Sequence, residues 1–310
     1  MATLFTNMLN SSFIILDGGM GQELVKRAKH KLTPLWSADV LRDHPDLVVE
    51  IHRDFIQAGA DVITLSSYAA TPTRLAKYNR QDEFEALQKF AINAAKQACH
   101  EMGLSTLIAG TLPPLPGSYR PSERLGSHLS QQEYQRILDQ QYKHVDLFLC
   151  ETMASIEEAC ISTSVAMKSG LPVWTALTVN EKDGSFLRSG EHIIKAAQAV
   201  LAEGASALLV NCSTPETTTQ ALSELAPYVK TMGAYANGFL TVEPLQGHAT
   251  VDLLKSRQEI NPNTYAEFAQ EWLLKGAKIL GGCCEIGPEH IEKIRSLRQN
   301  DHYEEIIKDY

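Results

Sequence analysis

The sequence predicts an α/β protein, a single-domain (β/α)8 barrel that spans residues 1–310. Two observations favour this fold. Eight apolar runs rich in β-branched residues recur along the chain, and each is followed by a segment with helical spacing, an alternation that indicates a parallel sheet covered by helices. The length suits one such barrel. An open doubly wound sheet is the alternative.

The eight predicted strands are short runs that recur along the whole chain. Amphipathic segments separate them, for example residues 83–103 after the second strand and 191–205 after the fifth. Glycines at 59, 204 and 276 stand between such a segment and the next strand, where a left-handed cap ends a helix. The predicted strands cover residues 13–17, 61–67, 105–112, 146–152, 172–179, 207–213, 231–238 and 278–284.

Two long segments follow predicted strands without a regular pattern. They are residues 112–128, rich in Pro and Gly, and residues 239–264 after the seventh strand. Because loops at the carboxyl ends of barrel strands bind substrates, we expect both segments to act as lids. The acidic C-terminal tail, DHYEEIIKDY, is expected to form a solvated helix, with a partner contact as the alternative.

Composition limits the class of function. Hydrophobic residues make up 44% of the chain and charged residues 21%, as in globular proteins. The net charge of −9 argues against nucleic acid or acidic lipid as a partner and favours a small-molecule substrate. The N-terminal residues lack the pattern of a secretory signal, and no apolar run reaches the roughly 18 residues of a membrane span, so a cytoplasmic protein is expected.

Three of the six cysteines fall at predicted strand ends. Cys212 ends the sixth strand, and Cys283 and Cys284 end the eighth. The carboxyl ends of parallel strands share one face of a barrel, so these thiols can meet although 71 residues (283 − 212) separate the first two. Three thiolates suit zinc and leave its fourth tetrahedral position open for a water or substrate. Ordinary buried thiols are the alternative at this point.

The motifs around these cysteines resemble a known family. VNCS at 210–213 together with GGCC at 281–284 is similar to the paired signature of the homocysteine S-methyltransferases. The resemblance covers nearly the whole chain and implies a (β/α)8 barrel that moves a methyl group onto the sulfur of homocysteine, making methionine. Further similar segments are ILDGGMGQEL (15–24), LWSADVL (35–41), AGADVITLSSYAATP (58–72) and LCETMASIEEA (149–159).

The resemblance also implies the metal centre. Cys212, Cys283 and Cys284 are expected to bind one Zn²⁺ per chain, with the homocysteine sulfur in the open position. A cation stabilises a thiolate over a thiol, so we expect no general base beside the metal.

Asp17 and Glu151 end the first and fourth predicted strands, which places two carboxylates on the same rim as the cysteines. The resemblance implies that they bind the amino-acid end of homocysteine together with the turn at Gly18 and Gly19, whose N–H groups suit the substrate carboxylate. Helix capping or a turn is the alternative for each acidic residue.

Two further residues are expected in the pocket. Tyr68 matches a tyrosine that faces the substrate in the family, and its ring would support a cationic donor; a place in the core is the alternative. Asn237 in YANG resembles the family's YPN-x-G turn and is expected to line the pocket.

The chain has room for one barrel, so the methyl donor should be a diffusible small molecule. S-methylmethionine is favoured, followed by S-adenosylmethionine, with betaine or another donor less favoured. Residues 112–128 depart from the pattern of the sulfonium-using branch. Another small thiol or selenol as acceptor, a non-catalytic zinc-binding or redox-sensing barrel, and a hydrolase or lyase that uses paired carboxylates remain as alternatives.

Overall fold

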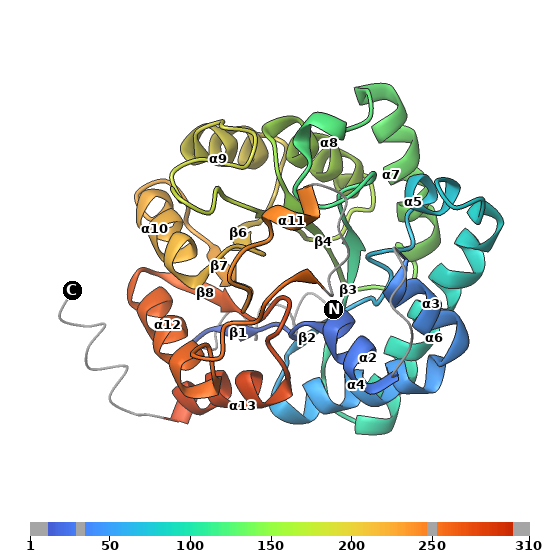
Figure 1. Ribbon diagram of the computed structural model, residues 1–310, viewed down its shortest axis with the longest axis horizontal. Helices are drawn as coiled ribbons and strands as arrows, with labels where there is room; N and C mark the ends of the chain where they lie inside the picture. Colours follow the sequence, from blue (N-terminus) through green and yellow to red (C-terminus); the bar gives the residue numbers. More distant parts are fainter. Residues whose placement is uncertain (1–11, 29–34, 247–252, 300–310) are drawn as a thin grey trace.

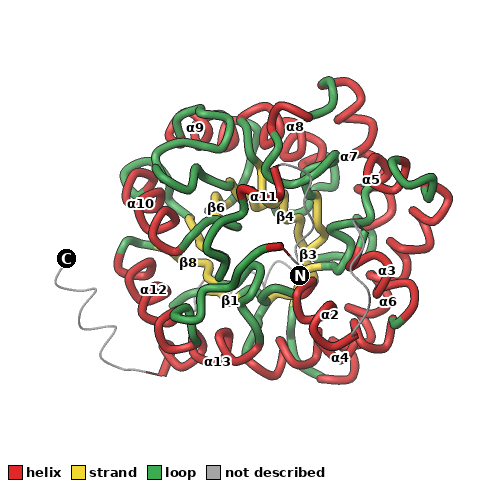
Figure 2. Tube along the Cα trace, viewed as in Figure 1, coloured by secondary structure: helices red, strands yellow, loops and turns green. Residues whose placement is uncertain are grey.

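The computed structural model describes residues 12–28, 35–246 and 253–299, and within them a ring of strands lies inside a ring of helices (Figures 1 and 2). Each of the eight predicted runs overlaps one strand. The strands are β1 (Ile14–Ile15), β2 (Val62–Thr64), β3 (Leu107–Leu112), β4 (Leu147–Met153), β5 (Val173–Leu177), β6 (Ala207–Asn211), β7 (Met232–Tyr235) and β8 (Ala277–Leu280).

All neighbouring strands are parallel, and their order around the sheet is β1-β8-β7-β6-β5-β4-β3-β2. A parallel bridge between Leu16 and Val62 joins β1 to β2 and brings the two edges of the sheet together. The predicted (β/α)8 barrel is therefore confirmed, and the open sheet is excluded.

The helices cover the outside of the sheet. Three of them end as predicted at glycines in the left-handed region, with φ of 114° at Gly59, 105° at Gly204 and 94° at Gly276. The helices are α2 (Met20–Ala28), α3 (Trp36–Asp43), α4 (Pro45–Ala58), α5 (Pro72–Ala76), α6 (Phe84–Met102), α7 (Ser127–Gln141), α8 (Ile156–Met167), α9 (Ile193–Ala202), α10 (Pro215–Leu225), α11 (Glu243–Gln246), α12 (Pro262–Leu274) and α13 (Pro288–Ser296), with 3₁₀ turns η1 (Gln81–Glu83), η2 (Pro121–Glu123) and η4 (Leu297–Gln299).

The inside of the barrel is filled with side chains. Alternate strand residues such as Leu16, Leu149, Leu209 and Ile279 form a buried cluster separate from the core between strands and helices. A barrel packed in this way is solid rather than a pore. Substrates must therefore bind above this cluster, at the carboxyl ends of the strands.

The two segments expected to act as lids contain short elements of regular structure. Residues 112–128 include η2, and residues 239–264 include α11 and a bridge between Phe239 and Ser256. Residues 247–252 and the tail at 300–310 lie outside the described residues. Among the described residues, no helix combines the length and apolar character that a bilayer crossing requires.

Candidate active site and metal centre

The three cysteines meet at the carboxyl end of the barrel. Cys212 directly follows β6, and Cys283 and Cys284 follow β8; their sulfur atoms all lie within 4.8 Å of one another. The N–H of Cys212 donates to the carbonyl of Tyr235, and the N–H of Cys283 to that of Ala236. Both sulfur-bearing turns are thus tied to β7 between them.

Two of these sulfurs are bonded to each other in this structure. Cys212 and Cys283 form a disulfide with their Cα atoms 5.7 Å apart, and Cys284 is free. This differs from the expectation of three thiols; the two strand ends bring this pair close enough to bond. Once the disulfide is reduced, the three cysteine sulfurs together suit a soft cation. Burial raises the pKa of the Cys284 thiol to about 12, so a thiolate there needs a cation beside it.

Glycines let the turn after β1 pack against the cysteine loop. A Cβ atom at Gly19 would lie 2.5 Å from the carbonyl oxygen of Cys283, and one at Gly18 would collide with that of Ile286. The N–H of Gly19 donates to the carbonyl of Ile286 over 2.8 Å in this structure, and its predicted contact with a substrate carboxylate stays a prediction. The N–H groups of Gly18 and Gly21 have no acceptor among the described residues.

Asp17 after β1 and Glu151 in β4 line the same cavity. Asp17 is 5% exposed and accepts the N–H of Thr64 at 2.7 Å and its hydroxyl at 3.2 Å. Glu151 accepts a short hydrogen bond from the hydroxyl of Thr111. Withdrawal from solvent raises the pKa of each carboxyl to about 7, and the charge of Glu151 adds to the shift of Asp17.

An irregularity in β4 accompanies Glu151. The pairing with β5 shifts register between Cys150 and Met153, and Thr152 has φ of 63°. The side chain of Asn211 holds this bulge, because its Oδ1 accepts the N–H of Thr152 at 3.0 Å and its Nδ2 donates to the Thr152 hydroxyl at 2.9 Å. Bulges commonly re-aim a side chain beside an active site.

Left-handed backbone gathers around the site. Of five described non-glycine residues with positive φ, Tyr119 (64°), Thr152 (63°), Cys212 (48°) and Glu285 (68°) lie at the carboxyl ends of strands or in the loops above them. Each costs of order 1–3 kcal/mol and persists only where neighbours hold it. For Cys212, the hydroxyl of Thr178 donates to its carbonyl over 3.3 Å.

A cavity of about 190 Å³ joins the sulfurs to the carboxylates. Every predicted site residue except Asn237 lines it. Asn237 is buried outside this wall, where its Oδ1 accepts the N–H of Phe239, so its place is the turn after β7 and not the predicted place in the pocket. Lining residues that sequence reasoning missed include Gly21, Arg74, Ser118 and Tyr235.

Tyr68 lies in the cavity wall, but one face of its ring is covered. The Arg74 guanidinium sits 4.9 Å from the ring centroid, and the Tyr68 hydroxyl is 2.7 Å from that of Ser118. Tyr235, at the end of β7, is 4% exposed, and its hydroxyl has no hydrogen-bond partner among the described residues. A buried hydroxyl in a cavity wall is available to a ligand.

Comparisons with known proteins identify the family. The family model described as homocysteine S-methyltransferase matches residues 14–297. Homocysteine S-methyltransferase of Escherichia coli (strain K12) is 27% identical, with 91% of this chain and 94% of the relative covered. Betaine--homocysteine S-methyltransferase 1 of Danio rerio is 26% identical, with 92% and 73% covered.

Solved structures show the same fold. The metallated form of the homocysteine methyltransferase MmuM from Escherichia coli has a TM-score of 0.79 at 24% identity, covering 95% of this chain and 99% of that one. Its oxidized form has a TM-score of 0.78 at 24% identity, covering 93% and 96%. Because the family model matches far more than half of its length, this chain belongs to the homocysteine S-methyltransferase family.

Proposed function

We propose that the protein is a zinc-dependent enzyme that transfers a methyl group from a small sulfonium compound to the sulfur of homocysteine, forming methionine. The observation that supports this most strongly is that one cavity carries both the three sulfurs and the two carboxylates. The first group suits a metal that activates a thiol, and the second suits the ammonium of an amino acid.

Cys212, Cys283 and Cys284, with the first two reduced, are proposed to hold one Zn²⁺. A zinc ion with three thiolate ligands supplies an open position and favours the ionised form of a substrate thiol at neutral pH. The chain then needs no strong base beside it. The two carboxyls that line the cavity, Asp17 and Glu151, have pKa values near 7 and are proposed to serve binding instead.

Homocysteine is proposed to bind by its amino-acid end along β1 and β4. Asp17 and Glu151 bind the ammonium and lose their residual protons as it enters. The substrate carboxylate meets the N-terminal end of α2, where the N–H groups of Gly18 and Gly21 lack acceptors among the described residues. Gly19, whose N–H donates to the carbonyl of Ile286, allows the cysteine loop to approach closely.

The donor is proposed to be S-methylmethionine, followed by S-adenosylmethionine, with betaine less favoured. Because Arg74 covers one face of the Tyr68 ring, Tyr68 is a weaker support for a cation than we expected from the sequence. The rings of Tyr119 and Tyr235 also line the cavity and are proposed to share this role.

The test is an assay of purified, reduced and zinc-loaded protein with homocysteine and each donor in turn. We expect methionine with S-methylmethionine and no turnover after zinc is removed by a chelator. Full activity in the chelated protein would contradict the proposed metal role. The same assay with selenohomocysteine or another thiol identifies the acceptor.

Two other functions are disfavoured by the geometry. A non-catalytic zinc-binding or redox-sensing barrel has no need of a cavity beside the sulfurs, although the bonded pair Cys212 and Cys283 would suit it. A hydrolase or lyase based on Asp17 and Glu151 would purify without stoichiometric zinc, so metal analysis separates it from the methyltransferase.

A further inference from the structure

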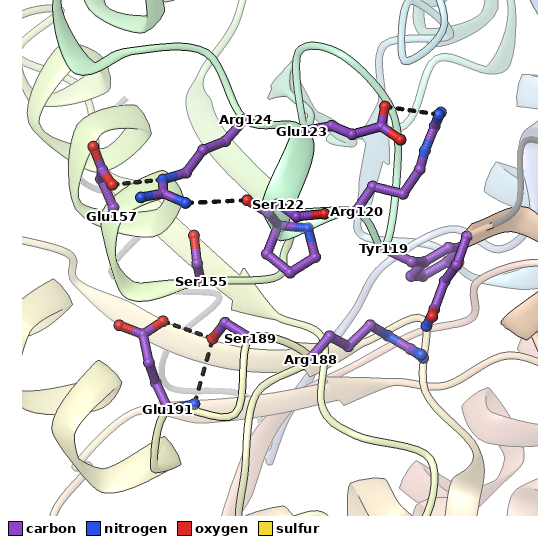
Figure 3. Close-up of a pocket in the computed structure, with 12 residues that line it drawn as sticks. Tyr119, Arg120, Ser122, Glu123, Arg124, Ser155, Glu157, Arg188, Ser189 and Glu191 are labelled. Carbon is purple, nitrogen blue, oxygen red and sulfur yellow. Dashed lines mark hydrogen bonds and ion pairs between the residues drawn. The ribbon is translucent and has the colours of Figure 1, made fainter.

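A second, larger cavity lies beside the first. It has a volume of about 620 Å³ and lies above the strands (Figure 3). Residues 119–124 after β3, Ser155 and Glu157 at the start of α8, and Arg188, Ser189 and Glu191 after β5 form its wall. Tyr119 lines both cavities, and α11 contributes Leu245 to the inner one and Gln246 to the outer one. The two spaces are therefore adjacent, with Tyr119 in the wall between them.

This wall is firmly held. The guanidinium of Arg188, whose side chain is 3% exposed, stacks 4.6 Å from the centroid of the Tyr119 ring (Figure 3). Arg188 also donates from Nε to the hydroxyl of Thr178 at 3.0 Å and from Nη2 to the carbonyl of Cys212 at 3.4 Å. The outer cavity thus begins at a residue in contact with the sulfur-bearing turn.

The opposite end of the outer cavity carries both signs of charge (Figure 3). Arg124 donates a hydrogen bond from Nε to the carboxylate of Glu157 at 2.5 Å and one from Nη1 to the carbonyl of Pro121 at 3.2 Å. Glu191 accepts the Ser189 hydroxyl at 2.6 Å and the N–H of Ile156 at 2.9 Å, both at Oε2. Among the described residues, Nη2 of Arg124 and Oε1 of Glu191 have no partner, so one donor and one acceptor remain for a ligand.

Size indicates that the inner cavity cannot enclose both substrates. Cavities for drug-sized ligands hold about 300–1,000 Å³, whereas the inner one holds about 190 Å³. Homocysteine and a sulfonium amino acid together approach the size of a drug molecule. With the acceptor in the inner cavity, most of the donor must extend beyond it.

Charge selects the kind of donor. Three arginines and three glutamates line the outer cavity, which is neutral as a whole, so a zwitterion fits it better than an anion. They are Arg120, Arg124, Arg188, Glu123, Glu157 and Glu191.

We propose that the outer cavity binds the amino-acid end of the sulfonium donor, with Arg124 on its carboxylate and Glu191 on its ammonium. This rests on the proposed function. The sulfonium methyl group reaches past Tyr119 to the acceptor sulfur. The acceptor thiolate supplies the electron pair of the new S–CH₃ bond, and the pair of the broken bond stays on the donor sulfur, which becomes a neutral thioether. The proton of the acceptor thiol leaves to solvent when the thiolate forms.

The test compares two donors in two variants. S-methylmethionine carries the amino-acid end, whereas trimethylsulfonium carries the same reacting group without it. In Arg124→Gln and Glu191→Gln, we expect the KM for S-methylmethionine to rise about tenfold, because each variant loses one charge-assisted hydrogen bond. The KM for trimethylsulfonium and the KM for homocysteine should not change. Glu203→Gln, on the exposed end of α9, is the matched control.

Calorimetric binding of both sulfonium compounds to the zinc-loaded protein supports the same comparison without turnover. An unchanged affinity for S-methylmethionine in both variants overturns the proposal, and so does an equal loss for the two compounds, which would indicate a structural effect. If wild-type protein methylates homocysteine from betaine but from no sulfonium compound, the proposed donor subsite and the sulfonium donor are both wrong. The proposal of a homocysteine methyltransferase is then still supported. If no donor yields methionine, the proposed function itself fails.

Discussion

The two cavities are built from different parts of the barrel. The inner one is formed mainly by the strand ends and the turns that directly follow them, including the three sulfurs and both carboxylates. The outer one is formed by longer connections and by surface ion pairs such as Arg124 with Glu157. Strand ends are fixed by the sheet, whereas connecting loops vary freely in length and sequence. We infer that acceptor chemistry is located on the rigid part and donor selection on the variable part.

The two cavities also differ in how much their residues affect the free energy of folding. Around the inner cavity the protein maintains left-handed backbone at Cys212 and Thr152 and two carboxyls with raised pKa values, all of which cost folding free energy. An exposed ion pair in the outer cavity contributes only about 0–1 kcal/mol. Substitutions in the inner region should therefore have the larger effects.

The largest effect is expected from Cys283→Ser in the inner cavity. A hard hydroxyl replaces a soft thiolate, so zinc affinity and methyl transfer should fall together, activity by more than about a hundredfold. Metal analysis of the reduced protein and the rate of methionine formation measure both. Cys160→Ser, on α8 and outside both cavities, is the control and should retain both properties. A Cys283→Ser enzyme with full activity would remove the cysteines from the mechanism.

A smaller effect is expected from Glu151→Ala. This change removes one of two carboxylates proposed for the substrate ammonium, so the dissociation constant of homocysteine should rise about 30-fold or more while zinc stays bound. Calorimetry with the zinc-loaded protein measures the affinity, and metal analysis measures the zinc. Loss of zinc in this variant would show instead that Glu151 supports the metal.

The pH dependence of binding tests the same carboxylates without substitution. With pKa values of about 7, Asp17 and Glu151 are largely protonated at pH 6 and ionised at pH 8. An ammonium ligand prefers the ionised forms, so affinity should rise by about tenfold over this interval. Methionine is the suitable probe, because it has the same amino-acid end and no thiol to titrate. An affinity that falls as the pH rises would contradict the assignment; Glu151→Gln should flatten the dependence.

The same division between strand ends and loops explains what could be predicted from the sequence. Strand order indicated that Cys212 can meet Cys283 and Cys284, because parallel strands end on one face, and the family resemblance singled out these three as a set. The caps at Gly59, Gly204 and Gly276 followed from local backbone chemistry. Both kinds of prediction depend on the sheet or on a few consecutive residues.

The features that were missed depend on irregular segments meeting in space. The stacking of Arg188 on Tyr119 joins the loops after β5 and β3, and no periodicity in the sequence links them. The Asn211 side chain that holds the Thr152 bulge acts across 59 residues. Asn237 lies outside the cavity wall, because a motif indicates a turn but not which of its side chains face the cavity.

The smallest effect is expected from Thr214→Ala, which separates support of the inner region from its chemistry. Thr214 caps α10 two residues after Cys212, and its hydroxyl accepts the N–H of Thr217 at 3.3 Å. Losing an N-cap of this kind costs about 1 kcal/mol of unfolding free energy, measured by urea denaturation. Since the Cys212 carbonyl is held independently by Thr178 and Arg188, zinc affinity and turnover should stay unchanged. If zinc affinity falls as well, the position of this sulfur depends on the helix that follows it, and the rigid part of the site extends beyond the strand ends.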